Sequence, residues 1–333
     1  MLSGSMRLRK TPISKLCKIR AGITMGDPSG IGPAITVKAL NRLTNAADFS
    51  VIGDAAVLNK IPGFNRILKN GVKVFDLKNV DAKGFEFGRI RGEYGRASVE
   101  YLNRALQLLN DQEIDCLITC PISKESVNLA GFNYSGHTEY FIKKTKPGPV
   151  VMMLLNKYLK FGLVTRHLSL RDVPGSLTPE GIYQVAFTTY KWLNDTVGIE
   201  YPRIVLCGLN PHASDNGLIG DEEVKVISPA AKKLQSKIKG FYGPLPADIA
   251  IHKALMGEYD AVIAMYHDQA LIPLKITGMD SGVNLTLGLG FIRTSPLHGT
   301  AFDIAAEQSY ADPSSLISAI KMALKCASIR KKA

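Results

Sequence analysis

The feature of this sequence that most limits its fold is the alternation of short apolar runs with amphipathic helical patterns. The apolar runs are strand-sized and fall well short of the roughly 20 residues that a membrane helix needs. Strands that alternate with helices form βαβ units, so we predict an α/β fold with a mainly parallel sheet covered on both faces. The predicted strands are 49–53, 72–77, 114–120, 150–155, 161–165, 203–209 and 260–266, and the predicted helices are 33–43, 97–110, 124–130, 179–193, 221–237 and 313–326.

The chain has 333 residues, which suits two α/β units better than one compact domain. Its net charge of +12 raises the possibility of a nucleic-acid binder. Much of the excess is terminal, in a basic extension over residues 1–20 and at the opposite end, with no basic stripe interleaved with aromatics between them. We therefore expect no nucleic-acid or membrane partner, although a basic protein still attracts anionic substrates. The five scattered cysteines have no zinc-knuckle or redox spacing, which favours a cytoplasmic protein.

A glycine-rich segment, residues 22–33, follows a strand-like opening and precedes a predicted helix. Gly26, Gly30 and Gly32 would let the backbone approach a ligand closely, and the helix N-terminus beyond them could hold an anion. The spacing does not match the dinucleotide fingerprint, and no acid follows at the expected distance. An ordinary Gly/Pro turn remains the alternative for this segment.

Five of the six histidines lie at the end of a strand pattern or in a turn, where loops of a parallel α/β fold converge. Three of them, His167, His212 and His267, each close an apolar run. They are 45 and 55 residues apart (212 − 167 and 267 − 212), so only folding or the pairing of two subunits could join them. Three imidazoles suit a divalent ion, most naturally zinc, with magnesium or cobalt as alternatives, and leave a coordination position open for substrate. Asp172 and Asp268 could orient these imidazoles or simply cap loops.

The stretch from Lys275 to Asp303 combines two cations with an amide. Arg293 can recognise a carboxylate or phosphate with two parallel hydrogen bonds, and Lys275 supplies a point charge. Asn284 stands in an otherwise apolar segment. These residues indicate a site for an anionic substrate, and the alternative is that both cations are plain surface charges.

Taken together, these segments resemble the 4-hydroxythreonine-4-phosphate dehydrogenase family of vitamin B6 biosynthesis. The resemblance runs from about Gly22 to the end of the chain, with every block in family order. The matching blocks are MGDP with GIGP (25–33), PISK (121–124), GHTE (136–139), His167 with LRDV (170–173), GLNPHA (208–213), GPLPAD (243–248), YDAV (259–262), MYHDQ (265–269), NLTLG (284–288), FIRTS (291–295) and HGTA (298–301).

The resemblance implies a fold like that of the isocitrate and isopropylmalate dehydrogenases, with two α/β/α lobes flanking a cleft and NAD or NADP bound without a Rossmann fingerprint. One lobe would comprise residues 21–125 plus 245–333 and carry the glycine-rich and cofactor loops. The other, residues 126–244, would carry metal histidines and dimer contacts. The segment 298–303, followed by 311–313, is similar to the adenosine-binding loop of that wider superfamily, which assigns the cofactor to His298, Gly299, Thr300 and Asp303.

The resemblance also implies site residues. A divalent metal would be held by His167, His212 and His267 and shared between the partners of a homodimer. The phosphorylated substrate would be bound by His137, Thr138, Lys275, Asn284 and Arg293. Lys124 and Asp268 are the candidates for the catalytic base, from their neighbourhoods only.

The implied reaction is the metal-dependent, NAD(P)-linked oxidation of 4-phosphooxy-L-threonine to 2-amino-3-oxo-4-phosphooxybutanoate. This β-keto acid decarboxylates to 3-amino-2-oxopropyl phosphate. The first alternative is a dehydrogenase of a related phosphorylated sugar acid, 4-phosphothreonate or 4-phosphoerythronate, because such relatives need the same phosphate and carboxylate contacts. A metal-dependent phosphoester hydrolase and a basic nucleic-acid binder are the further alternatives. The segment 307–310 departs from the family pattern in the cofactor loop and leaves the choice of NAD or NADP open.

Overall fold

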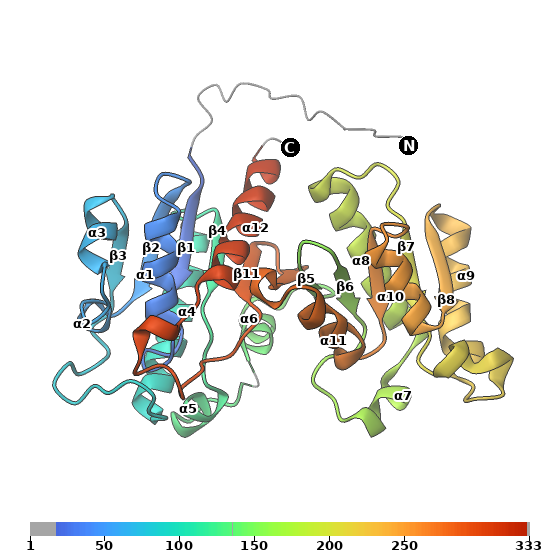
Figure 1. Cartoon of the computed structure of the whole chain (residues 1–333), viewed down its shortest axis with the longest axis horizontal. Helices are drawn as coiled ribbons and strands as arrows, with labels where there is room; N and C mark the ends of the chain where they lie inside the picture. Colours follow the sequence, from blue (N-terminus) through green and yellow to red (C-terminus); the bar gives the residue numbers. More distant parts are fainter. Residues whose placement is uncertain (1–17, 135, 332–333) are drawn as a thin grey trace.

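The computed structural model describes residues 18–134 and 136–331, and its strands all belong to one sheet. The strands are β1 (Arg20–Thr24), β2 (Asp48–Gly53), β3 (Lys73–Asp76), β4 (Cys116–Thr119), β5 (Val151–Leu155), β6 (Lys160–Leu163), β7 (Ile204–Cys207), β8 (Phe241–Leu245), β9 (Ala261–Ala264), β10 (Val283–Leu287) and β11 (Ile292–Pro296). Across the sheet their order is β3-β2-β1-β4-β11-β10-β5-β6-β9-β7-β8 (Figure 1).

Two groups of parallel strands make up most of this sheet. The first group runs from β3 to β11 and the second from β6 to β8. Between them β10 pairs antiparallel with both β11 and β5, and β5 pairs antiparallel with β6. The predicted mainly parallel sheet is therefore confirmed, but it contains an antiparallel seam that the apolar pattern did not reveal. Strands β10 and β11 escaped prediction because polar residues such as Asn284, Thr286 and Arg293 interrupt their apolar character.

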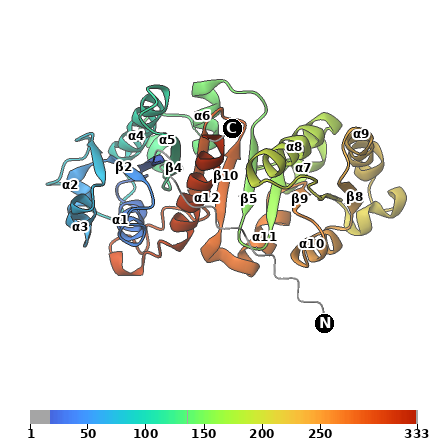
Figure 2. The ribbon, with the colours of Figure 1, turned by 90° about the horizontal axis from the view of Figure 1, so that it is seen from above.

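Helices cover both faces of the sheet, so each half is an α/β/α unit. In the view from above, α1, α10 and α11 lie on one face, and α4, α8 and α9 lie on the other (Figure 2). The α-helices are α1 (Gly32–Arg42), α2 (Ala55–Leu58), α3 (Phe64–Lys69), α4 (Gly92–Asn110), α5 (Lys124–Leu129), α6 (His137–Thr145), α7 (Val173–Ser176), α8 (Pro179–Trp192), α9 (Ser228–Lys237), α10 (Ala247–Leu255), α11 (His267–Gly278) and α12 (Ser314–Arg330). None of the helices in the described part of the chain is long and apolar enough to span a membrane.

Local signals explain where two of the predicted helices begin. The Thr178 hydroxyl accepts a hydrogen bond from the Gly181 N–H at 3.0 Å, and Pro179 takes the first helical position of α8, as the sequence indicates. The helix predicted from residue 221 instead opens with a π-helical turn, Glu223–Ile227, before α9. Within this turn Glu223 is buried and bonded to the loop after β7, which accounts for the irregular start.

The order of the strands in the sheet bears on how the chain divides into the two predicted lobes. Strand β9, from the segment 245–333, lies between β6 and β7, both of which come from 126–244. Chain segments on either side of residue 244 are thus interleaved in one half of the sheet. The lobe boundaries named above remain a prediction, and residues 1–17 of the predicted basic extension lie outside the described residues.

Helices α4 and α5 pack closely at a glycine. A Cβ atom added at Gly95, in α4, would overlap the carbonyl group of Ser126 in α5. Because Gly95 has no side chain, α5 can pack this closely against α4. Helix α5 is the helix that begins with the candidate base Lys124.

We expect Gly95→Ala to lower the free energy of unfolding by about 1–3 kcal/mol, because the added methyl group must push α5 away from α4. The matched control is Gly175→Ala in α7, where the added Cβ meets no atom within 4 Å. The measurement is urea unfolding followed by circular dichroism, and equal stabilities of the two variants would contradict the packing argument.

Candidate active site

A fully buried guanidinium lies on the antiparallel seam. Arg293, on β11, is only 1% exposed and donates hydrogen bonds to the hydroxyls of Thr119 (3.1 and 2.6 Å) and Thr286 (3.0 Å). No carboxylate among the described residues lies within ion-pair distance of it. Burial lowers the pKa of Arg293 to about 9, and nearby Glu139 partly counteracts this shift. A buried cation without a carboxylate partner is costly, and an anionic ligand would relieve that cost.

Further predicted substrate residues surround this guanidinium. Helix α6 begins with His137 and Thr138, and the ring of His137 feels the charge of Arg293. Burial lowers the pKa of His137 first and Arg293 lowers it further, so its imidazole is neutral at physiological pH. The His137 Nε2 and Asn284 Oδ1 atoms are enclosed and have no hydrogen-bond partner. The structure thus brings His137 close to Arg293 and places Asn284 two residues from Thr286, the strand partner of Arg293, on the same face of the sheet.

Two residues of this site were missed by sequence reasoning. Thr119 ends β4 and Thr286 lies on β10, where both hydroxyls orient the guanidinium. The available signal was a polar residue within a buried strand, because such a residue needs a hydrogen-bonding partner. Apolar patterning alone could not have shown that the partner was Arg293, which is 174 residues from Thr119.

Two of the three predicted metal histidines lie next to each other. The ring centroids of His167 and His267 are 5.6 Å apart. His267 is the first residue of α11, and its Nδ1 lies 2.7 Å from a carboxylate oxygen of Asp268. An ionised carboxylate only accepts hydrogen bonds, so this contact puts the proton on Nδ1 and leaves Nε2 as a lone-pair donor. Asp268 is therefore placed to orient the His267 imidazole, and its role at a metal site stays a prediction.

The histidine pair is electrostatically linked to the Arg293 pocket. Burial lowers the pKa of His167, Lys124 lowers it further, and Glu139 opposes these effects. The same Glu139 acts on Arg293. Glu139 thus acts on both His167 and Arg293, and it is a residue that the sequence analysis did not single out.

His212 follows β7 in a backbone conformation that L-residues rarely adopt. Five consecutive residues, 212–216, have positive φ values between 44° and 66°. Left-handed backbone of this kind costs roughly 1–2 kcal/mol per residue. The buried Glu223 carboxylate stabilises the base of the loop, since it accepts hydrogen bonds from the N–H groups of Leu209 (2.7 Å) and Asn210 (2.8 Å).

The residues present fit a divalent ion in part. Two imidazoles on one tetrahedral ion, with metal–nitrogen distances of about 2.0–2.1 Å, have ring centroids roughly 5 Å apart, close to the spacing of His167 and His267. Strands β6, β9 and β7 are adjacent and parallel, so the three histidine loops leave the same edge of the sheet. Within residues 18–134 and 136–331 of one chain, however, no group of three or more His, Cys, Asp or Glu side chains is placed to hold a metal. Of the three predicted metal histidines, only His167 and His267 make a ring contact with each other among the described residues.

The predicted cofactor loop packs against the glycine-rich segment. The Ile31 N–H donates to the Thr300 carbonyl at 2.9 Å, and a Cβ at Gly30 would press on that same oxygen. The close backbone approach expected from the glycines is therefore made, but to the chain's own loop. In this loop His298 is half-buried with an enclosed, unpartnered Nε2 atom, and Gly299 and Asp303 are exposed.

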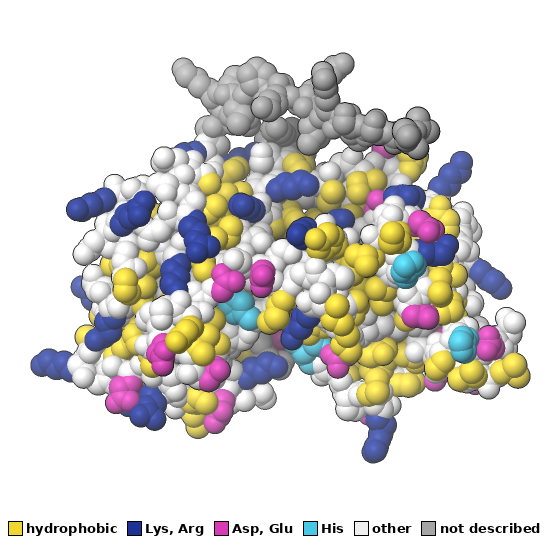
Figure 3. Space-filling model, viewed as in Figure 1, with side chains coloured by type: hydrophobic (Ala, Val, Ile, Leu, Met, Phe, Trp, Pro, Cys, Tyr) yellow, Lys and Arg dark blue, Asp and Glu magenta, His cyan; other side chains and the backbone are white. Residues whose placement is uncertain are grey.

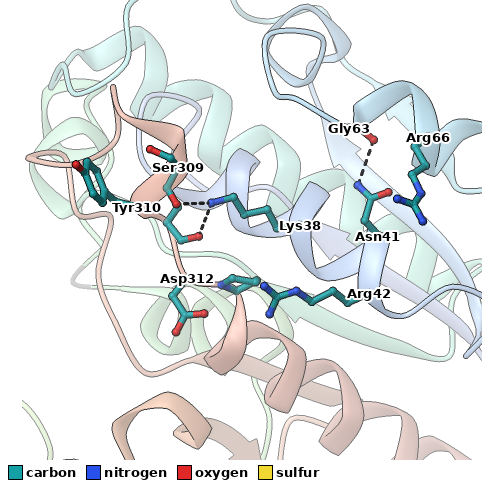
Figure 4. Close-up of a pocket in the computed structure, with 10 residues that line it drawn as sticks. Lys38, Asn41, Arg42, Gly63, Arg66, Ser309, Tyr310 and Asp312 are labelled. Carbon is teal, nitrogen blue, oxygen red and sulfur yellow. Dashed lines mark hydrogen bonds between the residues drawn. The ribbon is translucent and has the colours of Figure 1, made fainter.

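Lys38 holds the far end of the cofactor loop. Its ammonium group donates hydrogen bonds to the carbonyl oxygens of Gln308 (2.6 Å), Ser309 (3.0 Å) and Ala311 (2.8 Å). Figure 4 shows this lysine reaching from α1 across to the loop, beside a pocket of about 580 Å³ that Arg42 and Arg66 also line. Lys38 thus ties the segment 307–310, which departs from the family pattern, to α1 through hydrogen bonds to backbone carbonyl groups.

One predicted substrate residue is not brought to the site. Lys275 is exposed on α11, and no hydrogen bond or ion pair joins it to the described residues around Arg293. The assignment of Lys275 to substrate binding stays a prediction, because the structure of one chain does not place Lys275 beside the other predicted substrate residues.

A second buried titratable side chain is the carboxyl group of Asp27. This residue of the glycine-rich segment is 0% exposed, accepts a hydrogen bond from the Ser29 N–H at 3.0 Å, and leaves its other oxygen unpartnered. Its own N–H donates to the Pro121 carbonyl at 2.9 Å, beside the segment that carries Lys124. Burial raises the pKa of Asp27 from 3.8 to about 6.

We expect Asp27→Asn to change how stability depends on pH. Because the folded-state pKa is raised, the protonated carboxyl favours the folded state, and this contribution is lost as pH rises from about 4 to 6. A rise of about two pKa units corresponds to about 3 kcal/mol. Relative to the parent chain, Asp27→Asn should therefore gain stability by up to that amount between pH 4 and pH 7 in urea unfolding. Parallel stability curves for the two proteins would show that Asp27 titrates normally.

Comparisons with known proteins bear on this site. The family model of the pyridoxal phosphate biosynthetic protein PdxA matches residues 27–323. The 4-hydroxythreonine-4-phosphate dehydrogenase of Sulfurihydrogenibium sp. (strain YO3AOP1) is 40% identical over 327 residues, which cover 94% of this chain and 100% of that protein. The D-threonate 4-phosphate dehydrogenase of Salmonella typhimurium is 38% identical over 325 residues, covering 92% of this chain and 98% of the relative.

A solved structure agrees with these sequence relationships. The crystal structure of 4-hydroxythreonine-4-phosphate dehydrogenase from Klebsiella pneumoniae matches with a TM-score of 0.83 and 36% identity, covering 94% of this chain and 99% of that one. The fold and these relatives define an oxidoreductase of α/β architecture. The chain belongs to the PdxA family of pyridoxal phosphate biosynthetic proteins, which confirms the resemblance drawn from the ordered motifs.

Proposed function

We propose that this protein is a metal-dependent, NAD(P)-linked dehydrogenase that oxidises 4-phosphooxy-L-threonine in pyridoxal phosphate synthesis. The observation that carries the proposal is the buried Arg293 guanidinium, which lacks a carboxylate partner and is linked through Glu139 to the His167–His267 pair. Such an arrangement suits a substrate with a strongly anionic end and a reactive hydroxyl a few bonds away. The names of the relatives support the same chemistry.

The anionic end of the substrate would bind at the start of α6. This nine-residue helix opens at Gly136 without a side-chain cap, so its first N–H groups point toward a ligand together with the Thr138 side chain. Arg293 and Asn284 would complete the contacts from β11 and β10. We assign phosphate and carboxylate binding to this group of residues, in which the Arg293 guanidinium, the first N–H groups of α6 and the side-chain amide N–H groups of Asn284 would donate the hydrogen bonds.

The reacting end of the substrate would lie at the histidines. When bound there, a divalent metal, most naturally zinc, would lower the pKa of the substrate hydroxyl. Lys124 would take the hydroxyl proton, because Asp268 is already engaged with His267. His298, Gly299, Thr300 and Asp303 would hold the adenosine end of NAD(P), which when bound would supply the nicotinamide that accepts the hydride from C3. The product is a β-keto acid that loses carbon dioxide.

We further propose that the active enzyme is a homodimer that acts in the cytoplasm. Figure 3 shows hydrophobic side chains gathered over the half that carries α10 and α11. They include Ile272 (58% exposed), Ile276 (80%) and Met279 (50%) on and beside α11, which also carries Lys275. A second copy covering this face would bury the apolar patch and could bring Lys275 and His212 to a shared site. The described cysteines are free and buried, in keeping with a reducing compartment.

A second candidate substrate is D-threonate 4-phosphate. It differs from 4-phosphooxy-L-threonine only at C2, where a hydroxyl replaces the amino group. The Salmonella typhimurium relative carries that substrate in its name and is nearly as similar to this chain as the first relative. The choice therefore depends on the contacts around C2 rather than on the phosphate contacts.

The substrate is tested by NADH and NADPH production with a panel of both phosphorylated acids, 4-phosphoerythronate and the unphosphorylated parents. We expect turnover of 4-phosphooxy-L-threonine, loss of turnover with a chelator, and recovery with zinc or cobalt. Faster turnover of D-threonate 4-phosphate would reassign the substrate. Release of inorganic phosphate without a nicotinamide would instead identify a hydrolase.

The anion site is tested by Arg293→Lys, which keeps the charge and loses the paired hydrogen bonds. Charge-assisted hydrogen bonds contribute about 1.5–3 kcal/mol, so the KM for the phosphorylated substrate should rise about 10- to 100-fold. The KM for NAD serves as the internal control and should change less than about threefold. A larger effect on NAD than on the substrate would move Arg293 to the cofactor site.

A further inference from the structure

The three histidine-bearing loops are joined by one buried hydrogen-bond network. Its centre is the peptide backbone of Met265, which follows β9 and is 0% exposed. The Met265 N–H donates to the Gln269 side-chain carbonyl at 2.7 Å, and the Met265 carbonyl accepts from the Thr165 hydroxyl at 2.7 Å. Met265 precedes His267 by two residues, and Thr165 precedes His167 by two residues. The loops after β6 and β9 are thus tied at a fixed distance from their histidines.

Gln269 extends the network to the third loop. Its Nε2 donates to the Gly208 carbonyl at 2.8 Å, at the end of β7 and four residues before His212. The Gln269 side chain is 7% exposed, and both ends of its amide are satisfied within this network. One amide therefore connects two strand ends that are 57 residues apart in the chain (265 − 208).

We propose that Gln269 and Thr165 are positioning residues that set the mutual placement of the loops carrying His167, His212 and His267. The inference rests on the proposed metal-binding function of these histidines. Residues that orient metal ligands indirectly affect affinity because a misplaced imidazole must move before it can coordinate, and their mutation commonly costs 10- to 100-fold. The network uses only peptide groups and neutral side chains, so its geometry does not depend on pH.

Helix capping is an alternative explanation for the hydrogen bonds of the Gln269 side chain. The substitution Gln269→Glu distinguishes a capping role from the proposed positioning role. A side chain at the third helical position that accepts from a backbone N–H before the helix is a common N-terminal cap, and Gln269 makes such a contact with Met265. Gln269→Glu keeps this acceptor but replaces the donor to Gly208 by an oxygen. The added negative charge would by itself favour both the helix N-terminus and cation binding. A fall in metal affinity can therefore come only from the broken link to the β7 loop.

The experiment is cobalt(II) titration of the metal-free protein, followed by visible absorption, with zinc competition and the melting temperature of the metal-free protein measured in parallel. We expect the cobalt Kd of Gln269→Glu to rise about 10-fold. Thr165→Val, which loses one hydrogen bond and keeps the side-chain shape, should show a smaller rise. Because Thr165→Val changes a single contact, it keeps the proposal testable if Gln269→Glu folds poorly.

The matched control is Asn156→Leu. Asn156 is another buried amide tied to α11, donating to the Leu274 carbonyl and to Thr277 at 3.0 Å each, but at the end of the helix away from the histidine loops. We expect this control to lower the melting temperature without changing the cobalt Kd of the folded protein.

The outcomes separate the two proposals. If the parent chain binds no cobalt, the proposed metal-dependent function fails and this inference fails with it. If the parent binds cobalt and both Gln269→Glu and Thr165→Val bind it equally well, only the positioning role is overturned. Weaker cobalt binding in Asn156→Leu, by the same factor, would also overturn it, because general destabilisation would then explain the effect.

Discussion

The structure depends on the antiparallel pairing of β10 with β11 and β5. These pairings join two groups of parallel strands into one continuous sheet, so the backbone hydrogen bonds of β10 hold the two halves of the molecule together. β10 comes from the last fifth of the chain and β5 from its middle, and the seam can form only after most of the sequence has been placed. Asn284 and Arg293, the residues that we propose for substrate binding, lie on β10 and β11.

The buried position of the Arg293 guanidinium follows from this antiparallel seam. A guanidinium between three strands is removed from water, and the hydroxyls of Thr119 and Thr286 only partly replace its hydration. The site is therefore suited to an anion before any ligand is present. The Glu139 carboxylate acts on both Arg293 and His167, so the proposed anion site and the proposed metal site are electrostatically connected.

The family assignment establishes the class of enzyme, whereas the chemistry of the site bears on which substrate it binds. Similarity over nearly the whole chain establishes an oxidoreductase of the PdxA family, but relatives of almost equal identity carry the names of two different phosphorylated substrates. The proposed role of the buried arginine fits either substrate, because both carry a phosphate and a carboxylate. Under the proposed function, the contacts at C2 would therefore decide between the two substrates.

The sequence by itself determined the α/β class, most of the strands of the parallel groups and the family, because apolar periodicity and ordered motifs are local properties of the chain. It also selected Arg293, since an arginine can recognise a phosphate or carboxylate with two hydrogen bonds, and His137, which lies in a predicted turn. Only the tertiary structure decided that β10 and β11 are strands, that Thr119 and Glu139 belong to the site, and that His167 and His267 form a pair without His212. These facts depend on contacts between residues far apart in the chain, and local patterning carries no information about which distant groups will meet.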